Sequence, residues 1–404
     1  MYELPVGWEW KKLGELCNFI RGPFGGSLKK QIFKESGNAV YEQSHAIYNQ
    51  FEQIRYFIDD EKFEEMKRFE LRPNSLIMSC SGTIGKVAIV PKDIKKGIIN
   101  QALLMLTPND ELNNIFLKLM IESNFFQTLL SENSTGAAIA NVASVKVLKE
   151  IKIPLPPLSE QQRIVSKLDL LFEKIDKSIA LHQKNMDEAN AFMGSVLNDV
   201  FGELEEKYET NTLNDVCNKI TDGTHKSPKT IEKGYPYITV RDITEKGKIN
   251  FNDCEFVNNE DFKRLKNGNC APMKDDVLFS KDGTVGKVTV VDFQKDFVIL
   301  SSLAILRPSD DLDSYFLYYT MKSPKFFDFA QSKKTGAAIK RVVLRTIKEF
   351  EIPKPPLNIQ QKVVKYLDEI SQKIEKIKQA QKTKMNSLKA LKASILDQAF
   401  KGEL

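Results

Sequence analysis

The chain repeats itself once over its whole length, and this repeat limits its possible folds more than any other feature. IPLPPLSEQQRIVSKLD at 153–169 returns as IPKPPLNIQQKVVKYLD at 352–368. Four further pairs lie at nearly the same offset: ELCNFIRG (15–22) with DVCNKITDG (215–223), SLIMSCSGTIGKVAIV (75–90) with VLFSKDGTVGKVTVV (277–291), TGAAI (135–139) with TGAAI (335–339), and SVLNDVFGEL (195–204) with SILDQAFKGEL (394–404). The 404 residues therefore predict two copies of one module, at a period far too long for a solenoid.

Composition narrows the class of protein. A hydrophobic fraction of 42% and a charged fraction of 28% are typical of a globular protein, and no apolar run is long enough for a membrane span. The start MYELPVGWEWKKLGEL lacks the apolar core of a signal peptide, so we expect a cytoplasmic protein with no membrane partner. The cysteines have no CxxC spacing, which argues against a disulfide framework and a zinc knuckle: Cys17, Cys80, Cys217, Cys254 and Cys270. The net charge of +5 permits nucleic-acid binding without requiring it.

The globular part of each copy combines strand and helix patterns. Residues 75–90 and 277–291 each place a glycine turn between two apolar runs, which predicts a β-hairpin. Residues 114–130 and 314–331 carry apolar side chains at helical spacing. We therefore expect an α+β fold with two homologous mixed α/β domains.

The repeated line predicts a stiff entry into a helix. Its prolines exclude helix and favour an extended backbone. Ser159, followed three residues later by Gln162, fits a capping box, and Asn358 with Gln361 repeats the pattern. We therefore expect Ser159 and Asn358 to cap the starts of two helices.

A long helical stretch follows each repeated line. About 40 residues after Ser159 contain no proline, which predicts a helix of roughly 60 Å. Apolar residues recur every three or four positions, as in a coiled-coil seam: Ile164, Leu168, Leu171, Ile175, Ile179, Met186, Ala189, Met193, Val196 and Val200, then Val363, Leu367, Ile370, Ile374, Ile377, Met385, Leu388, Leu391 and Ile395. The polar residues His182 and Gln381 interrupt the two seams and are predicted to fix their register.

An amphipathic helix of this length needs a cover, and we expect each helix to cover the other. Residues 159–204 hold five basic and eight acidic residues, whereas residues 358–404 hold ten and five, so pairing also joins opposite net charges. The alternative is that each helix packs on its own globular domain. An antiparallel pair would form a coiled coil that relates the two domains by a pseudo-two-fold axis.

The sequence contains no recognisable catalytic motif. GTIGK (82–86) and GTVGK (283–287) have two residues between their glycines where a phosphate-binding loop has four, and valine follows each lysine. HExxH, GxSxG and the Asn/Asp-Pro-Pro-Tyr/Phe run of adenine methyltransferases are absent. We therefore predict no catalytic residue and no metal ligand.

Polar loops are the remaining candidates for function, as a surface that reads a polyanion. The stretches at 20–31, 41–50, 220–234 and 237–248 supply basic, amide, hydroxyl and imidazole side chains, which suit phosphates and base edges. With the hairpin tips, the predicted DNA-binding residues are Arg21, Lys29, Lys30, Gln43, Ser44, His45, Thr83, Lys86, Thr221, Asp222, Thr224, His225, Lys226, Arg241, Asp242, Thr284 and Lys287. For any one of them alone, a solvated loop residue is the better explanation, so the prediction depends on the set.

This arrangement resembles the specificity (S) subunit of type I restriction-modification systems. The twin lines, the paired GTIGK and GTVGK hairpins, the TGAAI repeats, and DGTHKSP (222–228) followed by YPYITVRDI (235–243) carry the resemblance. The match spans the chain in the order domain, helix, domain, helix. It implies target-recognition domains at 1–157 and 205–356 and helical spacers at 158–204 and 357–404.

The resemblance also implies a function and partners. Each recognition domain is expected to read one half of a bipartite, asymmetric double-stranded DNA target, while the helices set the gap. Two modification (methyltransferase) subunits using S-adenosylmethionine, and restriction (endonuclease/translocase) subunits using ATP and Mg, are the implied partners. No cofactor is expected on this chain itself. Docking of the partners is expected along the helices and repeated lines, at Ser159, Gln162, His182, Asn358, Gln361 and Gln381.

Other functions remain open on the sequence alone. The chain is also compatible with the specificity subunit of a related methyltransferase-only or fused restriction system, or with a non-DNA coiled-coil scaffold. A self-sufficient nuclease or methyltransferase would require an unrecognised site, and we expect the purified chain neither to cut nor to methylate DNA.

Overall fold

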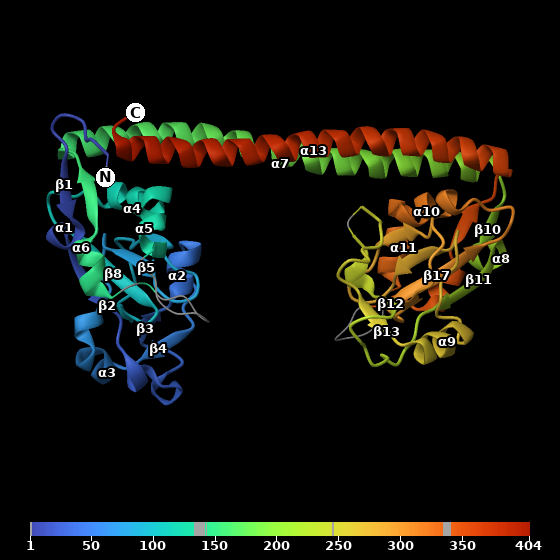
Figure 1. The fold of residues 1–404 in the computed structure, drawn as a ribbon, viewed down its shortest axis with the longest axis horizontal. Helices are drawn as coiled ribbons and strands as arrows, with labels where there is room; N and C mark the ends of the chain where they lie inside the picture. The colour runs from blue at the N-terminus through green and yellow to red at the C-terminus, as the bar shows by residue number, and fades with distance from the viewer. Residues whose placement is uncertain (1, 133–141, 143, 245, 334–340) are drawn as a thin grey trace. The chain divides into compact units, whose positions relative to one another are not determined.

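The computed structural model describes residues 2–132, 142, 144–244, 246–333 and 341–404, so both TGAAI segments lie outside the described residues. The chain forms two compact units: unit 1 comprises Met1–His182 and Thr383–Leu404, and unit 2 comprises Gln183–Lys382. Each unit contains one globular part and a portion of both long helices (Figure 1). No helix in the described part of the chain combines the length and hydropathy needed to cross a membrane.

Unit 1 contains three small sheets. The four-stranded sheet has the order β2-β8-β5-β6, the three-stranded sheet β4-β3-β7, and β1 pairs with β9. Their bounds are β1 (Glu9–Lys12), β2 (Cys17–Arg21), β3 (Asn38–Tyr41), β4 (Tyr56–Ile58), β5 (Leu76–Ser79), β6 (Val87–Ile89), β7 (Gly97–Ile99), β8 (Leu103–Pro108) and β9 (Lys152–Leu155). The helices are α1 (Leu13–Leu16), α2 (Gln43–Tyr48), α3 (Asp60–Glu65), α4 (Asn114–Glu122), α5 (Asn124–Glu132) and α6 (Val145–Glu150), with 3₁₀ turns η1 (Gly25–Leu28), η2 (Lys30–Ile32) and η3 (Lys67–Phe69).

Unit 2 repeats this topology. Its sheets are β11-β17-β14-β15, β13-β12-β16 and β10-β18. The strands are β10 (Thr210–Thr212), β11 (Cys217–Asp222), β12 (Tyr235–Ile238), β13 (Glu255–Val257), β14 (Val277–Ser280), β15 (Val288–Val290), β16 (Val298–Ile299), β17 (Leu303–Pro308) and β18 (Glu351–Pro353). The helices are α8 (Leu213–Val216), α9 (Asn259–Asn267), α10 (Ser314–Lys322), α11 (Pro324–Ser332) and α12 (Leu344–Lys348), with the 3₁₀ turn η4 (Val240–Asp242). The matching strand orders confirm the repeat predicted from the sequence.

The two predicted hairpins are present. β5 pairs antiparallel with β6, and β14 with β15, in matching registers. Gly82 and Gly283 have φ values of 66° and 69°, a backbone conformation that glycine adopts without strain. The lysine of each GTxGK segment therefore leads into a strand, which is not the context of a phosphate-binding loop.

Each segment predicted as one helix forms two. α4 ends and α5 begins around Ser123, and α10 and α11 are separated by Ser323. Both serines have extended backbones, with ψ values of 150° and 145°. Ser323 precedes Pro324, which disfavours helical geometry at the residue before it, and its hydroxyl then caps α11 by accepting from Phe326 N at 3.2 Å.

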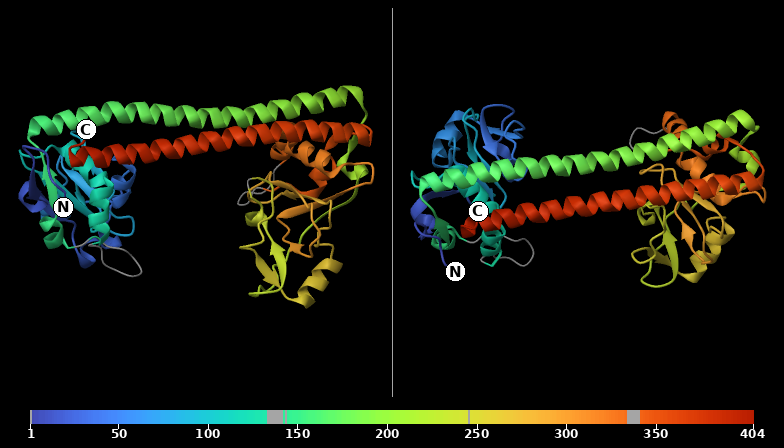
Figure 2. Two further views of the ribbon diagram at one scale, coloured as in Figure 1. Left: turned by 45° about the horizontal axis from the view of Figure 1, so that its top comes forward. Right: turned by 90° about the horizontal axis from the view of Figure 1, so that it is seen from above.

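The long helices α7 (Leu158–Lys207) and α13 (Leu357–Lys401) run antiparallel within each unit (Figure 2). In unit 1, Lys392 Nζ lies 2.7 Å from Asp176 Oδ2, and Arg163 Nη2 donates to Leu404 O at 2.9 Å. In unit 2, Phe192 and Ile374 line one groove and Val200 and Val363 line another. As residue numbers rise along α7, those of its neighbours on α13 fall, as the predicted antiparallel coiled coil requires.

Near their ends, the long helices also pack into the globular cores. In these parts the alternative prediction, packing on a globular domain, applies. Ile164 and Leu168 of α7 join the core of unit 1, together with Phe400 of α13. Leu197 of α7 and Leu367 of α13 join the core of unit 2. Two predicted seam residues, Ile377 and Leu391, are each 48% exposed rather than buried.

All five cysteines are described and free. Burial raises the pKa of the Cys17, Cys80 and Cys217 thiols to about 12. These side chains therefore pack as neutral apolar groups, as their spacing predicts.

Candidate nucleic-acid interface

The first predicted loop of unit 2 is built around a buried lysine. Lys281 Nζ lies 3.2 Å from Asp222 Oδ2 and 3.2 Å from Asp282 Oδ2, and its side chain is only 6% exposed. His225 Nε2 lies 3.3 Å from Asp222 Oδ1, and its own side chain is 76% exposed. Asp222 thus neutralises a buried cation while presenting an exposed imidazole.

Two oxygens beside this lysine have unused hydrogen-bonding capacity. Asp282 Oδ1 and Ser302 Oγ are buried and have no partner among the described residues. Lys281 N bonds to Ser302 O, which ties the two segments together. Buried polar groups are rarely left unpaired in native proteins, so the pair marks a place where a further donor would be accommodated.

The equivalent place in unit 1 has different chemistry. Arg21 faces Leu104 across β2 and β8, just as Asp222 faces Ala304 across β11 and β17. Cys80 follows β5 where Lys281 follows β14. The cation therefore lies on the outer strand in unit 1 and after the central hairpin strand in unit 2. Arg21 Nε is buried without a partner among the described residues.

The second predicted loop of unit 1 forms helix α2. Gln43 and Ser44 line a hollow with three polar residues that sequence reasoning missed, Gln50, Gln53 and Arg55. Gln43 Oε1 is buried with no partner among the described atoms. Amides and an arginine in one hollow can pair with the edges of bases. Gln50 ends the predicted stretch at 41–50, and Gln53 and Arg55 follow directly after it.

His45 lies deeper than the prediction requires. Its side chain is 1% exposed, its Nδ1 accepts from Glu42 N at 2.9 Å, and its ring packs against Tyr41 and Phe51. In this conformation the imidazole organises the start of α2 and does not face solvent.

Other predicted residues divide between exposed and internal positions. Lys29, Lys30, Thr83, Lys86, Lys226, Arg241 and Thr284 are exposed, while Thr221 is half-buried. Thr224 is buried and donates to Lys226 O at 2.8 Å. Asp242 Oδ2 accepts from Thr239 N and Thr239 Oγ1, so this carboxylate caps η4. Lys287 Nζ donates to Ile243 O at 2.6 Å, which holds it inside unit 2.

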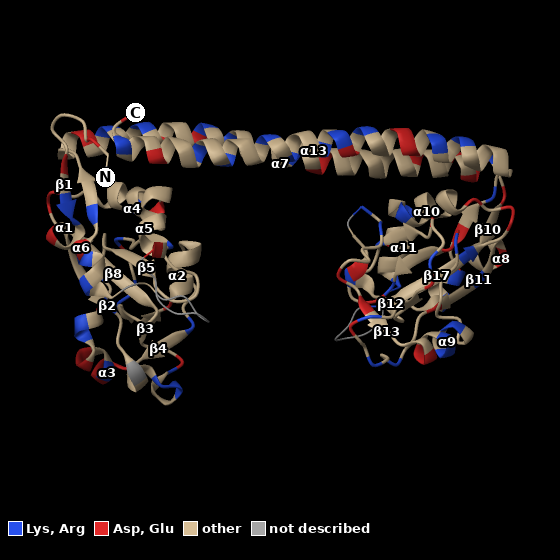
Figure 3. Ribbon diagram, in the orientation of Figure 1, with Lys and Arg blue, Asp and Glu red and all other residues tan. Residues whose placement is uncertain are grey.

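Basic residues recur in the loops around β12 and β13 (Figure 3). They include Lys226, Lys229, Lys233 and Arg241. Arg241 Nη2 lies 3.7 Å from Glu255 Oε1, and the Arg241 side chain is 76% exposed. This stretch of unit 2 can therefore offer several cations to a phosphate backbone.

The capping boxes predicted in the repeated lines are wrong. α7 begins at Leu158, and Pro157 O accepts from Glu160 N and Gln161 N at 2.9 and 3.0 Å. α13 begins in the same way, with Pro356 O accepting from Gln360 N. The proline before each helix supplies the first accepting carbonyl and loses no N–H that the helix needs. Ser159, Gln162, Asn358 and Gln361 are therefore exposed positions in the first turns.

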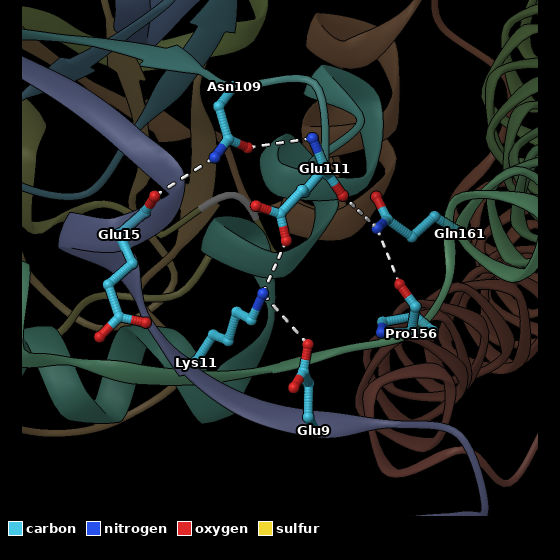
Figure 4. Close-up of polar contacts among 7 residues, drawn as sticks. All are labelled: Glu9, Lys11, Glu15, Asn109, Glu111, Pro156 and Gln161. Atoms are coloured by element: carbon cyan, nitrogen blue, oxygen red, sulfur yellow. Dashed lines mark hydrogen bonds and ion pairs between the residues drawn. The ribbon is translucent and has the colours of Figure 1, made fainter.

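The neighbouring glutamines, Gln161 and Gln360, have the buried role instead, and Figure 4 shows the contacts of Gln161 with Glu111 and Pro156. Gln161 Oε1 accepts from Asn113 N at 2.8 Å, while its Nε2 donates to Glu111 O at 2.8 Å and Pro156 O at 2.9 Å. The signal was present in the sequence, because both copies have a Gln-Gln pair at this point. His182 and Gln381 are half-buried, and their predicted role in register stays a prediction.

Comparisons with known proteins match the whole repeat. A family model described as the type I restriction modification DNA specificity domain matches residues 5–189 and 205–385. A Methanocaldococcus jannaschii protein, described provisionally as the type I restriction enzyme MjaX specificity subunit, is 26% identical, covering 96% of this chain and 92% of its own.

Two solved structures share the fold. A chain solved in work on complex assembly and conformational transition of the type I R-M system aligns over 100% of both chains, with a TM-score of 0.70 and 23% identity. The HsdS subunit from Thermoanaerobacter tengcongensis aligns over 100% of this chain and 99% of its own, with a TM-score of 0.51 and 23% identity.

Proposed function

We propose that each globular part of this chain reads one half of a bipartite, asymmetric DNA target, because the chain belongs to the type I restriction-modification DNA specificity family. DNA target recognition is the function of this family, in which specificity subunits are the non-catalytic component. The proposal includes recognition domains at 1–157 and 205–356 and helical spacers at 158–204 and 357–404.

One observation supports unlike half-sites most strongly. The same strand positions carry Arg21 and Cys80 in unit 1 but Asp222 and Lys281 in unit 2. An arginine donates to guanine acceptors, whereas a carboxylate and its exposed histidine partner offer a different donor and acceptor pattern. Two readers of one fold that carry their cation at different positions are therefore expected to prefer different bases.

Within each reader we assign DNA contacts to the accessible members of the predicted set. In unit 1 these are Lys29, Lys30, Gln43, Ser44, Thr83 and Lys86, with Arg55 added. In unit 2 they are Thr221, His225, Lys226, Arg241 and Thr284. His45, Thr224, Asp242 and Lys287 support the loops through the internal contacts described above, and Arg21 and Asp222 lie at the base of the surface.

The modification subunits are proposed to dock on an exposed apolar stripe of the long helices. Leu170 and Leu181 of α7 are 61% and 57% exposed in unit 1, and Phe192 is 56% exposed in unit 2. Steps of 11 residues return a helix to nearly the same face after three turns. Tyr366 and Ile377 of α13, each 48% exposed in unit 2, have the same spacing. Large apolar side chains repeated along one face suit a partner helix.

Cofactors and location follow from these roles. We assign S-adenosylmethionine to the modification subunits, and ATP with Mg to the restriction subunits, because the proposed work of this chain is recognition. We place the complex in the cytoplasm, where bacterial and archaeal DNA is accessible.

The decisive experiment is to co-express the chain with its cognate methyltransferase subunit and map methylated positions genome-wide. The expected result is methylation within one bipartite motif that has two different halves and one fixed gap. Methylation at a contiguous or palindromic motif, or none at all from an active complex, would contradict the proposal.

A further inference from the structure

Each unit buries one glutamine amide where a long helix leaves the globular part. Gln161 and Gln360 are both 0% exposed. Gln360 repeats every contact of Gln161: its Oε1 accepts from Asp313 N at 2.8 Å, and its Nε2 donates to Asp311 O at 2.9 Å and Pro355 O at 2.8 Å. The contact pattern is therefore a property of the repeated module and not of one local environment.

The amide joins three segments at once. Asn113 is the N-cap of α4, and its side chain accepts from Ile115 N and Phe116 N. Glu111 lies in the turn before that helix, and Pro156 follows β9. Gln161 therefore fastens the first turn of α7 to the start of α4 and to the strand that enters the joint. Reversing the amide would place like groups against each other at all three contacts, so one orientation is selected.

The turn that receives the amide is itself braced by an ion pair from another strand. In unit 1, Lys11 Nζ of β1 lies 2.6 Å from Glu111 Oε2, and Asn109 Nδ2 donates to Glu15 O at 3.2 Å (Figure 4). In unit 2, Lys354 Nζ lies 2.5 Å from Asp311 Oδ2. The lysine that holds this turn comes from β1 in unit 1 and from the residue after β18 in unit 2, while the glutamine is unchanged.

A small loss of rigidity here has a large effect at distance. α7 has 50 residues, which corresponds to a helix of about 75 Å. Tilting such a helix by about 3° moves its far end by ~4 Å, close to the rise of one base pair, ~3.4 Å. Leu197, near the C-terminal end of α7, lies in the core of unit 2, so the same helix enters both globular cores.

We infer that Gln161 and Gln360 are positioning residues that fix the angle between each globular part and its long helix, and so restrict the complex to one gap between half-sites. This inference rests on the proposed function. The accuracy of the gap between half-sites then depends on two buried amides and not on the length of the helices alone.

The test compares Gln161→Ala, Gln360→Ala and the double variant in the methylation-mapping experiment. Ser166→Ala and Lys365→Ala are matched controls, because these residues are exposed and occupy equivalent positions on α7 and α13 shortly after the two buried glutamines. The readout is the ratio of methylation at sites with the native gap to methylation at sites one base pair longer or shorter. The double variant is expected to lower this ratio by about tenfold, with both half-sites unchanged, and the controls to leave it unchanged.

A purely structural role predicts a different result. Methylation would then fall by the same factor at all gaps, the ratio would not move, and the inference would be overturned. The double variant Gln161→Met, Gln360→Met keeps the side-chain volume and serves as the second variant if alanine prevents folding. An unchanged ratio in this variant would also overturn the inference. Absence of a bipartite motif with the wild-type chain would instead reject the proposed function.

Discussion

At the residue scale, the two readers differ most where buried charges are paired. Lys281 and its two carboxylates are largely removed from water, and the carboxylates are 13% and 23% exposed. Removing one member of a buried ion pair leaves an uncompensated charge, which costs far more than losing a surface pair. The cluster therefore supports the loop that carries His225 and Lys226.

Replacing Lys281 by Met is expected to lower the free energy of unfolding by about 3 kcal/mol, because Asp222 and Asp282 then repel each other without the cation. Urea unfolding measures the change. Lys266→Met removes an exposed pair with Asp296, whose side chains are 54% and 60% exposed, and should cost less than about 1 kcal/mol. Equal costs for the two variants would show that the Lys281 cluster is not effectively buried.

Lys29→Ala and Lys226→Ala are expected to weaken DNA binding across sequences. Each should also reduce the slope of log K against log salt concentration by about 1, because one phosphate contact is lost. Binding by the assembled complex is measured at several salt concentrations. Lys177→Ala, at a 74% exposed position on α7, is the control. If neither loop variant changes the slope, the DNA-binding surface does not include Lys29 or Lys226.

At the element scale, the long helices have two kinds of surface. Their inner faces meet each other and, near their ends, the globular cores. The spaced apolar side chains Leu170, Leu181 and Phe192 of α7 are each more than half exposed. The regular interval between these exposed residues is the basis of the proposed docking of the modification subunits.

Phe192→Asp is expected to reduce co-purification of the methyltransferase subunit by about tenfold or more, because a charge replaces an anchoring aromatic side chain. The matched control is Asn190→Asp, which adds the same charge at an exposed position on a different face of α7. Affinity capture at constant expression, with thermal unfolding as the folding check, gives the comparison. Retained capture by the Phe192 variant would contradict docking on this stripe.

At the whole-molecule scale, helix length is the proposed measure of the gap. Deleting seven residues from each long helix, 182–188 and 379–385, shortens both by about 10.5 Å, or roughly three base-pair steps. The expected result in methylation mapping is the same two half-sites with a gap about three base pairs shorter. Alanine replacement of the same fourteen positions keeps the length and should keep the gap. An unchanged gap after the deletion would refute the measuring role of the helices.

The sequence predicts large features better than the contacts that hold them. The repeat, the hairpins and the two long helices follow from spacing, because repeated segments, glycine turns and apolar periodicity can be seen along the chain. The capping boxes failed because a proline carbonyl started each helix earlier than the Ser and Asn signals indicated. The Asp222–Lys281 pair joins residues far apart in the chain, and no local pattern indicates which lysine a carboxylate will meet.

The interleaved make-up of unit 1 has a consequence for protein synthesis. Its core includes Leu396, Ala399 and Phe400, and the Phe400 ring packs edge-on against Phe116 at a centroid distance of 5.2 Å. Unit 2 is one continuous stretch, Gln183–Lys382, which the ribosome completes first. At about 5–20 residues per second, the globular part that is translated first waits roughly 10–40 s for its closing segment. Unit 1 is therefore translated first but completes its folding last. Its open apolar core is the surface that a chaperone would meet on the nascent chain.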